Sequence, residues 1–243
     1  MGWKSGVMFK HVLVALTVIF VIGCHSAPSQ TAENTVNGAN VVSTAQTPMA
    51  TATTTLALDW GPKGQSSQVA IADVLTYSGA KPTITAPAGW ALIRDDSTKT
   101  VRQSLYWHEV AANDASSSTW TFSEPVDAQG AVLLLDNVAS GTPVDVSSGN
   151  TDVSGTLDAK SVVTTSDGDL ILTFWATDYS HPSLNPVMPA NTKTLLNLET
   201  PSNQYWVLAS YQNESGATED NVIGGGQLFS WVAAQVAVKR GPH

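Results

Sequence analysis

Short apolar runs recur along the chain from Leu56 onward, and clusters of Gly, Pro, Asn, Asp and Ser separate them. No segment of this region keeps a 3.6-residue apolar period for three turns, which argues against helices. This spacing predicts an all-β fold, a jelly-roll-like antiparallel β-sandwich of about ten to twelve strands. The predicted strands are Leu56–Trp60, Gln68–Tyr77, Thr83–Ala86, Trp90–Arg94, Val101–Val110, Thr119–Phe122, Gly130–Leu135, Lys160–Thr164, Leu170–Thr177, Thr194–Leu198, Gln204–Tyr211 and Gln227–Val238.

Residue alternation within these runs predicts which strands are central. The run Val101–Val110 places Leu105 and Trp107 on one face and Tyr106 and His108 on the other, as in a half-buried strand. By contrast, three runs are apolar on both faces, so we expect them to lie inside sheets that are covered on both sides. They are Gly130–Leu135, Leu170–Thr177 and the closing strand Gln227–Val238.

The N-terminus has the three parts of an exported protein's leader. A segment with Lys4 and Lys10 precedes an apolar run over residues 12–22, and Gly23 and Cys24 follow. This order is typical of a secretory signal peptide, and the apolar run is short for a membrane-spanning helix, which needs about 20 residues. We therefore expect residues 1–23 to be a signal peptide.

The residues at the expected cleavage site, Val21-Ile22-Gly23-Cys24, resemble the lipobox of bacterial lipoproteins. The resemblance implies that the Cys24 thiol receives a diacylglycerol, that the chain is cut before it, and that the new amino group is acylated, for example by palmitate. The alternative is a plain signal peptide, or an uncleaved anchor helix, with an incidental cysteine. Lipidation would explain the unpaired thiol, and two or three acyl chains anchor a protein stably.

The segment after the cysteine differs in composition from the rest of the chain. Residues 24–54 are rich in Ala, Thr, Ser, Asn, Gln and Pro and contain no aromatic residue. This composition predicts a flexible tether between the lipid and a β-sandwich domain over residues 55–240. The alternative is a first strand that pairs with the domain around Val41 and Val42.

The charge of the chain excludes some partners. Of the eleven Lys and Arg residues, Lys4 and Lys10 lie in the leader, which leaves nine against twenty acids and a net charge of −11. Such a surface repels phosphate backbones, so we expect no nucleic-acid partner. It also repels anionic lipids, so the acyl chains must supply the membrane attachment. The expected location is the bacterial cell envelope, outside the cytoplasm, and His25 in place of an aspartate favours the outer membrane or cell surface.

The most site-like segment follows the apolar strand Leu170–Thr177. Asp178, Tyr179, His181 and Asn185 combine an acid, an aromatic ring, an imidazole and an amide on a loop that contains two prolines. Binding residues often lie on loops that a rigid scaffold positions, so these residues are candidate ligands of a glycan or a surface protein. The alternative is an ordinary connection at the sandwich edge.

Two further groups are candidates for binding. Tyr106 and His108 share a strand face and could line a concave sheet, although they could also lie under a neighbouring segment or face water. Asp167 and Asp169 flank a glycine and offer hard oxygen ligands, so a structural calcium ion is the cofactor considered; the alternative is a tight turn. The sequence contains no Gly-x-Ser-x-Gly elbow, no HExxH motif and no Walker loop.

Several stretches together resemble an uncharacterised β-sandwich module that recurs in secreted and surface proteins of bacteria and in some phage structural proteins. The resemblance covers roughly Leu56 to Lys239 and implies a jelly-roll-like sandwich in an extracellular setting, with no catalytic residues to transfer. The motifs that carry it are Val74–Tyr77, Ile84–Ile93, Ser104–His108, Trp120–Phe122, Pro143–Asp145, Ser148-Gly149 and Trp231–Ala234.

The sequence therefore favours a membrane-anchored, extracytoplasmic lipoprotein that acts as a non-catalytic binding or adhesion module for a carbohydrate or surface polymer. Two alternatives remain. One is an enzyme that acts on extracellular polysaccharides, which would need two carboxylates, or a histidine and an acid, in one cleft. The other is a structural or assembly lipoprotein, which would expose a contiguous apolar patch.

Overall fold

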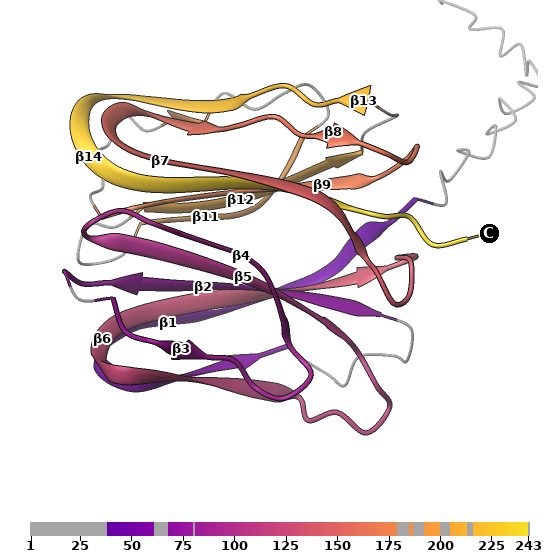
Figure 1. Cartoon of the computed structure of the whole chain (residues 1–243), viewed down its shortest axis with the longest axis horizontal. Helices are drawn as coiled ribbons and strands as arrows, with labels where there is room; N and C mark the ends of the chain where they lie inside the picture. Colours follow the sequence, from indigo (N-terminus) through magenta and orange to yellow (C-terminus); the bar gives the residue numbers. More distant parts are fainter. Residues whose placement is uncertain are drawn as a thin grey trace, which may run out of the picture. The chain divides into compact units, whose positions relative to one another are not determined.

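Two antiparallel β-sheets pack face to face in the computed structural model of the chain (Figure 1). The structure describes residues 38–60, 68–79, 81–178, 185–186, 192–199, 205–212 and 216–242. All of these residues belong to one compact unit, Val36–His243. The prediction of an all-β antiparallel sandwich is confirmed.

The first sheet is built from the first half of the chain. Its strand order is β1-β6-β2-β5-β4, and the short strand β3 pairs with β6. The strands of this half are β1 (Asn40–Asp59), β2 (Val69–Tyr77), β3 (Ile84–Thr85), β4 (Ala91–Ser97), β5 (Val101–Glu109) and β6 (Ser117–Asp136).

The second sheet is built from the second half and repeats the same order. It reads β7-β14-β9-β12-β11, and the short strand β10 pairs with β14 as β3 pairs with β6. The predicted central positions of Gly130–Leu135 in β6, of β9 and of the closing strand β14 are confirmed. The strands are β7 (Val144–Ala159), β8 (Val163–Thr164), β9 (Leu170–Thr177), β10 (Asn185–Pro186), β11 (Lys193–Glu199), β12 (Tyr205–Gln212), β13 (Gly216–Ala217) and β14 (Asn221–Val238), with β8 and β13 in a separate small ribbon.

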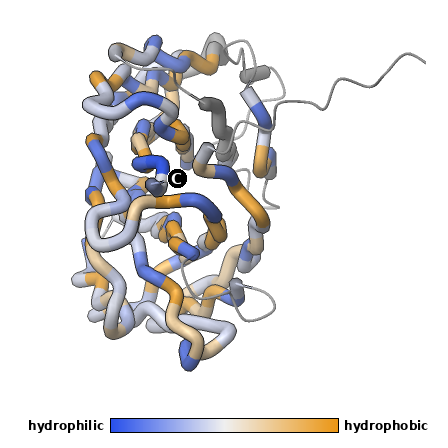
Figure 2. Tube along the Cα trace, turned by 90° about the vertical axis from the view of Figure 1, so that its right-hand side faces the viewer, coloured by the Kyte–Doolittle hydropathy of each residue, from blue (hydrophilic) through white to orange (hydrophobic). Residues whose placement is uncertain are grey.

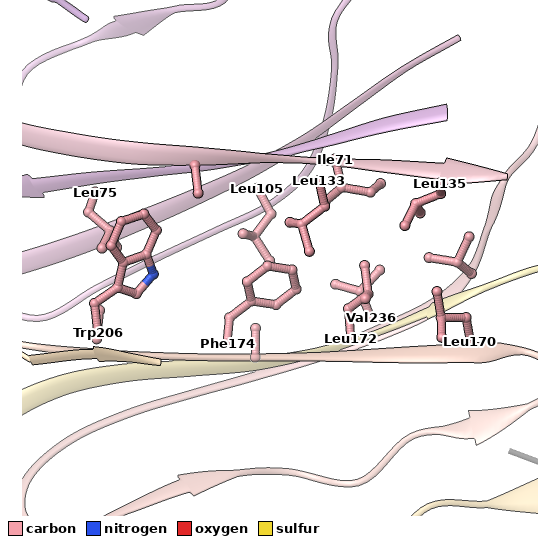
Figure 3. Packing of buried hydrophobic residues seen from close by; sticks show 14 of the residues in the cluster. Ile71, Leu75, Leu105, Leu133, Leu135, Leu170, Leu172, Phe174, Trp206 and Val236 are labelled. Atoms are coloured by element: carbon pink, nitrogen blue, oxygen red, sulfur yellow. The ribbon is translucent and has the colours of Figure 1, made fainter. Parts of the chain in front are cut away.

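The main core lies between the two sheets, where alternate residues of each strand point inward (Figure 3). Along the trace in Figure 2, hydrophobic and hydrophilic residues follow one another at short intervals. Each large apolar side chain fully buried here contributes about 1.5–3 kcal/mol to the free energy of unfolding. The first sheet contributes Ile71, Leu75, Leu105, Leu133 and Leu135, and the second contributes Leu170, Leu172, Phe174, Trp206 and Val236.

The paired strands β1 and β6 extend beyond the first sheet and fold back over its outer face (Figure 1). Register shifts in β1 between Thr47 and Thr55 mark the bend. We call the folded-back part arm 1: residues 55–59 of β1, residues 117–122 of β6, and β3. Its apolar side chains pack on the outer face of the first sheet, and Leu58 lies so close to Gly130 that a Cβ there would come within 2.9 Å of it.

The strands β7 and β14 repeat this arrangement on the second sheet. Their register shifts between Gly224 and Phe229, and residues 156–159 of β7, residues 221–224 of β14 and β10 form arm 2. Leu157 and Ile223 of arm 2 pack against the outer-face side chains Trp175 and Trp231. Each sheet is therefore covered on both faces, which explains why its central strands are apolar on both sides.

The predicted tether is wrong over residues 40–54, because β1 already begins at Asn40. The alternative of a first strand around Val41 and Val42 is what the structure shows. Most of this stretch is exposed at the sheet edge, so its polar composition resembles that of a linker, while the backbone pairs with β6 and Val41 packs on the core. Cys24 and the leader lie outside the described residues, and none of the described residues form a helix long and apolar enough to cross a membrane.

One carboxylate lies inside the main core. Asp73 of β2 is fully buried, and its Oδ2 accepts hydrogen bonds from Trp206 Nε1 of the opposite sheet at 2.8 Å and from Gln103 Nε2 at 3.1 Å. Burial raises the pKa of Asp73 to about 7, although both hydrogen bonds act to lower it. The sandwich therefore encloses an acid that ionises near neutral pH.

We expect the stability of the protein to fall as the pH rises from about 4 to about 7, since only the unfolded chain has an ionised Asp73 in that range. Asp73→Asn keeps an oxygen acceptor for Trp206 without the charge. It should remove this part of the pH dependence and stabilise the protein at pH 8 by up to about 4 kcal/mol. Urea unfolding at several pH values, followed by tryptophan fluorescence, measures the difference. Asp152→Asn, at an exposed position, is the control, and an equal pH slope in wild type and Asp73→Asn would contradict the prediction.

Candidate functional site

The predicted binding loop is only partly described. Tyr179 and His181 lie outside the described residues, and Asn185 is described as part of β10, where it pairs with Gly224 in arm 2. Asp178 is described and half-buried at the end of β9. The structure therefore does not bring these four candidates together into a described site.

Asp178 connects the two sheets. Its Oδ2 accepts a hydrogen bond from the Thr100 hydroxyl in the turn between β4 and β5. Its Oδ1 accepts one from the Ser230 backbone N–H at 3.1 Å, and its own N–H donates to the Ser230 carbonyl. Both carboxylate oxygens are therefore used within the fold, which assigns Asp178 a structural role.

Tyr106 and His108 share one face of β5, as residue alternation predicts, but other segments cover both. Arm 1 covers Tyr106, and Trp60 and Trp90, beside arm 1, cover most of the His108 ring. Tyr106 is 5% exposed and lies 5.9 Å from Trp120 between ring centroids. The His108 ring stacks on Trp90 at 5.3 Å and meets the edge of Trp60 at 5.5 Å. Of the alternatives for this pair, the structure shows burial under a neighbouring segment.

Hydrogen bonds fix the His108 ring. Nδ1 lies 2.9 Å from the Gly89 carbonyl oxygen, and Nε2 lies 2.8 Å from Asp114 Oδ2. Burial opposes ionisation of Asp114, but the Ala111 N–H and the His108 ring outweigh it and hold the pKa of Asp114 below its usual value. Gly89 has φ of +85°, and a Cβ there would come within 2.9 Å of the imidazole. His108 thus joins two turns beneath arm 1.

The outer side of arm 1 carries hydroxyl groups in register. Thr55 of β1 pairs with Thr121 of β6, and Thr121 pairs with Thr85 of β3. All three are exposed, because the neighbouring residues Leu56 and Trp120 point into the arm. We call this surface the hydroxyl face; it consists of Thr55, Thr83, Thr85, Thr119, Thr121 and Ser123, all exposed.

The geometry of the hydroxyl face follows from the sheet. Hydroxyls on neighbouring strands are spaced by about 4.8 Å, and alternate residues along one strand by about 6.8 Å. A hydroxyl both donates and accepts hydrogen bonds, so the face can pair with either kind of group. Ser123 Oγ accepts from the Thr83 N–H at 2.9 Å, which holds the edge of the face. The sequence carries a signal for it in the Thr-x-Thr pattern of residues 83–85 and 119–121, but the pattern alone does not show that these segments are neighbours.

The structure separates the two acids of the predicted calcium turn. Asp167 is exposed in the turn, whereas Asp169 is fully buried and faces the Asp145 carboxylate of β7. Among the described residues, no group of three or more His, Cys, Asp or Glu side chains is placed to hold a metal ion. The pairing of Asp169 with Asp145 was not predicted, because the two residues are distant in sequence.

No protein-family model, curated protein or solved structure matches this chain. The resemblance to a recurring secreted module stays a prediction from the motifs quoted above.

We expect Asp178→Ala to destabilise the protein by about 1–2 kcal/mol, because the Thr100 hydroxyl and the Ser230 N–H lose their acceptor. Chemical denaturation gives the free energy of unfolding. Glu124→Ala, on an exposed part of β6, is the control and should change it by less than about 0.5 kcal/mol. Equal stabilities of the two variants would show that Asp178 has no structural role.

Proposed function

We propose that the protein is a membrane-anchored, extracytoplasmic lipoprotein of the bacterial cell envelope, and that its β-sandwich is a non-catalytic binding or adhesion module. The lipobox-like residues Val21–Cys24 support the anchor. The hydroxyl face of arm 1 supports the binding role and is the single observation that carries it. The proposed partner is a hydroxyl-rich surface polymer, such as a polysaccharide.

The chain length between anchor and domain sets how far the module extends from the membrane. Cys24 precedes the first strand residue, Asn40, by 16 positions. A segment of that length spans at most about 55 Å when fully extended. The module therefore acts close to the membrane that holds it.

The hydroxyl face suits a neutral, repeating ligand. The mature chain has a net charge of −11, and the six residues of this face are uncharged. The exposed acid Asp59 lies on the same side of β1, at the end of arm 1. Sugar hydroxyls can exchange hydrogen bonds with threonine and serine hydroxyls, and a repeating polymer can use several strands at once. The aromatic cluster beneath the face, with Trp90 and Trp120 at 4.9 Å between ring centroids, holds the strands in place.

The two alternatives receive less support. An enzyme would need two carboxylates, or a histidine and an acid, in one cleft. Asp145 and Asp169 are buried, and Asp158 and Asp220 both pair with Lys160. Both ring nitrogens of His108 are taken up by Gly89 and Asp114. A structural or assembly role predicts a contiguous apolar patch. In the described part of the chain, the large apolar side chains that are exposed lie on five different strands; they are Val42, Leu92, Val153, Val163 and Val222.

Cys24→Ser should abolish metabolic labelling with radioactive palmitate and either block removal of the leader or release the domain from the membrane fraction. Labelling, mass spectrometry of the N-terminus and membrane fractionation in a bacterial host measure this. The wild-type chain, expressed in parallel, is the control. A Cys24→Ser protein that remains labelled and membrane-bound would refute the anchor.

Replacement of Thr55, Thr85 and Thr121 by valine should reduce retention on insoluble surface polysaccharides at least about tenfold, because valine keeps the shape and strand preference but lacks the hydroxyl. Pull-down of the full-length protein in detergent measures retention. The control replaces the exposed residues Thr151 and Thr156 of β7 by valine and should bind like wild type. Equal binding of both variants, or no retention of wild type on any polymer, would reject the proposed surface.

A further inference from the structure

A cluster of oxygen ligands lies at one end of the second sheet, where four segments meet. Asp145 stands near the start of β7, Thr165 follows β8, and Asp169 immediately precedes β9. Lys239 and Arg240 follow β14. The cluster belongs to the second sheet, whereas the hydroxyl face belongs to the strands of the first.

The Asp169 carboxylate is buried without an adequate donor. The residue is 0% exposed, and neither of its carboxylate oxygens receives a well-aligned hydrogen bond. Its polar neighbours are the Asp145 carboxylate and the backbone N–H of Arg240. Burial first, and then the charge of Asp145 and the contact with its carboxylate, raise the pKa of Asp169 to about 6, although Lys239 and the Arg240 N–H act to lower it. A carboxylate in such a place requires a counter-ion or a proton.

Asp145, in contrast, is held as an anion. Burial opposes its ionisation, but the Thr165 side chain and backbone N–H, each donating at 2.6 Å, outweigh burial and keep its pKa below the usual value. The Lys239 ammonium is 3.8 Å from Asp145 Oδ1, at the outer limit of an ion pair, and the Lys239 side chain is 29% exposed. It compensates only part of the charge of two carboxylates.

We propose that Asp145 and Asp169, with the Thr165 hydroxyl, bind a calcium ion at this end of the second sheet. The side chains offer only oxygen atoms, which suits a hard cation and does not suit zinc, whose sites use nitrogen and sulfur. Calcium takes six to eight oxygen ligands in flexible geometry, so carbonyl oxygens and water complete the shell. The ion neutralises Asp169 and ties β7, the β8–β9 turn and the start of β9 together.

Calcium titration of the full-length, EDTA-treated protein tests the site. We expect calcium in the millimolar range to raise the thermal unfolding midpoint by several degrees, and equilibrium dialysis with ⁴⁵Ca²⁺ to give one bound ion per chain. Magnesium should have a smaller effect because it requires tighter octahedral geometry. Asp169→Asn should lose both the shift and the bound ion. Asp167→Asn, in the same turn but exposed, is the matched control and should keep them.

Thr165→Val keeps both carboxylates and should weaken calcium binding at least about threefold, which preserves the test if Asp169→Asn does not fold. Two outcomes would overturn the proposal. One is the absence of bound ⁴⁵Ca²⁺ on the wild-type chain at about 10 mM, above the range of weak extracellular sites. The other is calcium binding that Asp169→Asn and Asp167→Asn retain equally. Without bound calcium, a gain in stability on acidification that Asp73→Asn keeps and Asp169→Asn loses would identify a proton shared by Asp145 and Asp169 instead.

Discussion

The fold depends on two pairs of long strands that each belong to two layers at once. Over part of their length, β1 with β6 and β7 with β14 complete a sheet; beyond a shift in register they cover that sheet's outer face. The outer faces carry tryptophans, among them Trp175 and Trp231, which water would otherwise reach. The same two strands form part of the sheet and then cover its outer face. Their backbone pairing and the burial of apolar side chains on both faces of the sheet therefore depend on each other. In arm 1, alternate side chains pack on the first sheet, and the side chains between them face outward and form the hydroxyl face.

The duplicated strand order makes the differences between the halves informative. Gln103 pairs with Leu75, two residues after Asp73, and Trp206 pairs with Ala176, two residues after Phe174. The two donors to the buried carboxylate thus occupy corresponding places, and Asp73 stands where the second half has a phenylalanine. The arms differ as well: arm 1 presents hydroxyls, whereas arm 2 exposes Val222. The two halves therefore share their strand order, and different residues at corresponding positions give each half its own polar groups.

Residue alternation predicted the strands and the faces on which their side chains lie. It did not predict contacts between residues that are distant in sequence. It identified β6, β9 and β14 as central and placed Tyr106 and His108 on one face. It could not show that Trp60 and Trp120 cover that face, or that Asp169 meets Asp145, since both depend on pairing across the fold. The composition of residues 40–54 predicts a linker, because an exposed edge strand and a linker can have the same polar composition. The hydroxyl face could have been found from Thr-x-Thr, but only once β3 and β6 were known to be neighbours.

Each sheet is built from one half of the chain, and this has a consequence for the order in which the chain folds. Asn40 pairs with Asp136, so the first strand has no partner until most of the first half has been made. All strands of the first sheet precede Pro143, however, and none of its ladder hydrogen bonds needs a later residue. A chain emerges from its N-terminus during synthesis, and folding tends to follow that order. The strand pairing of the first sheet and its cover by arm 1 therefore need only the first half of the chain, whereas its inner face is buried only once the second sheet is present.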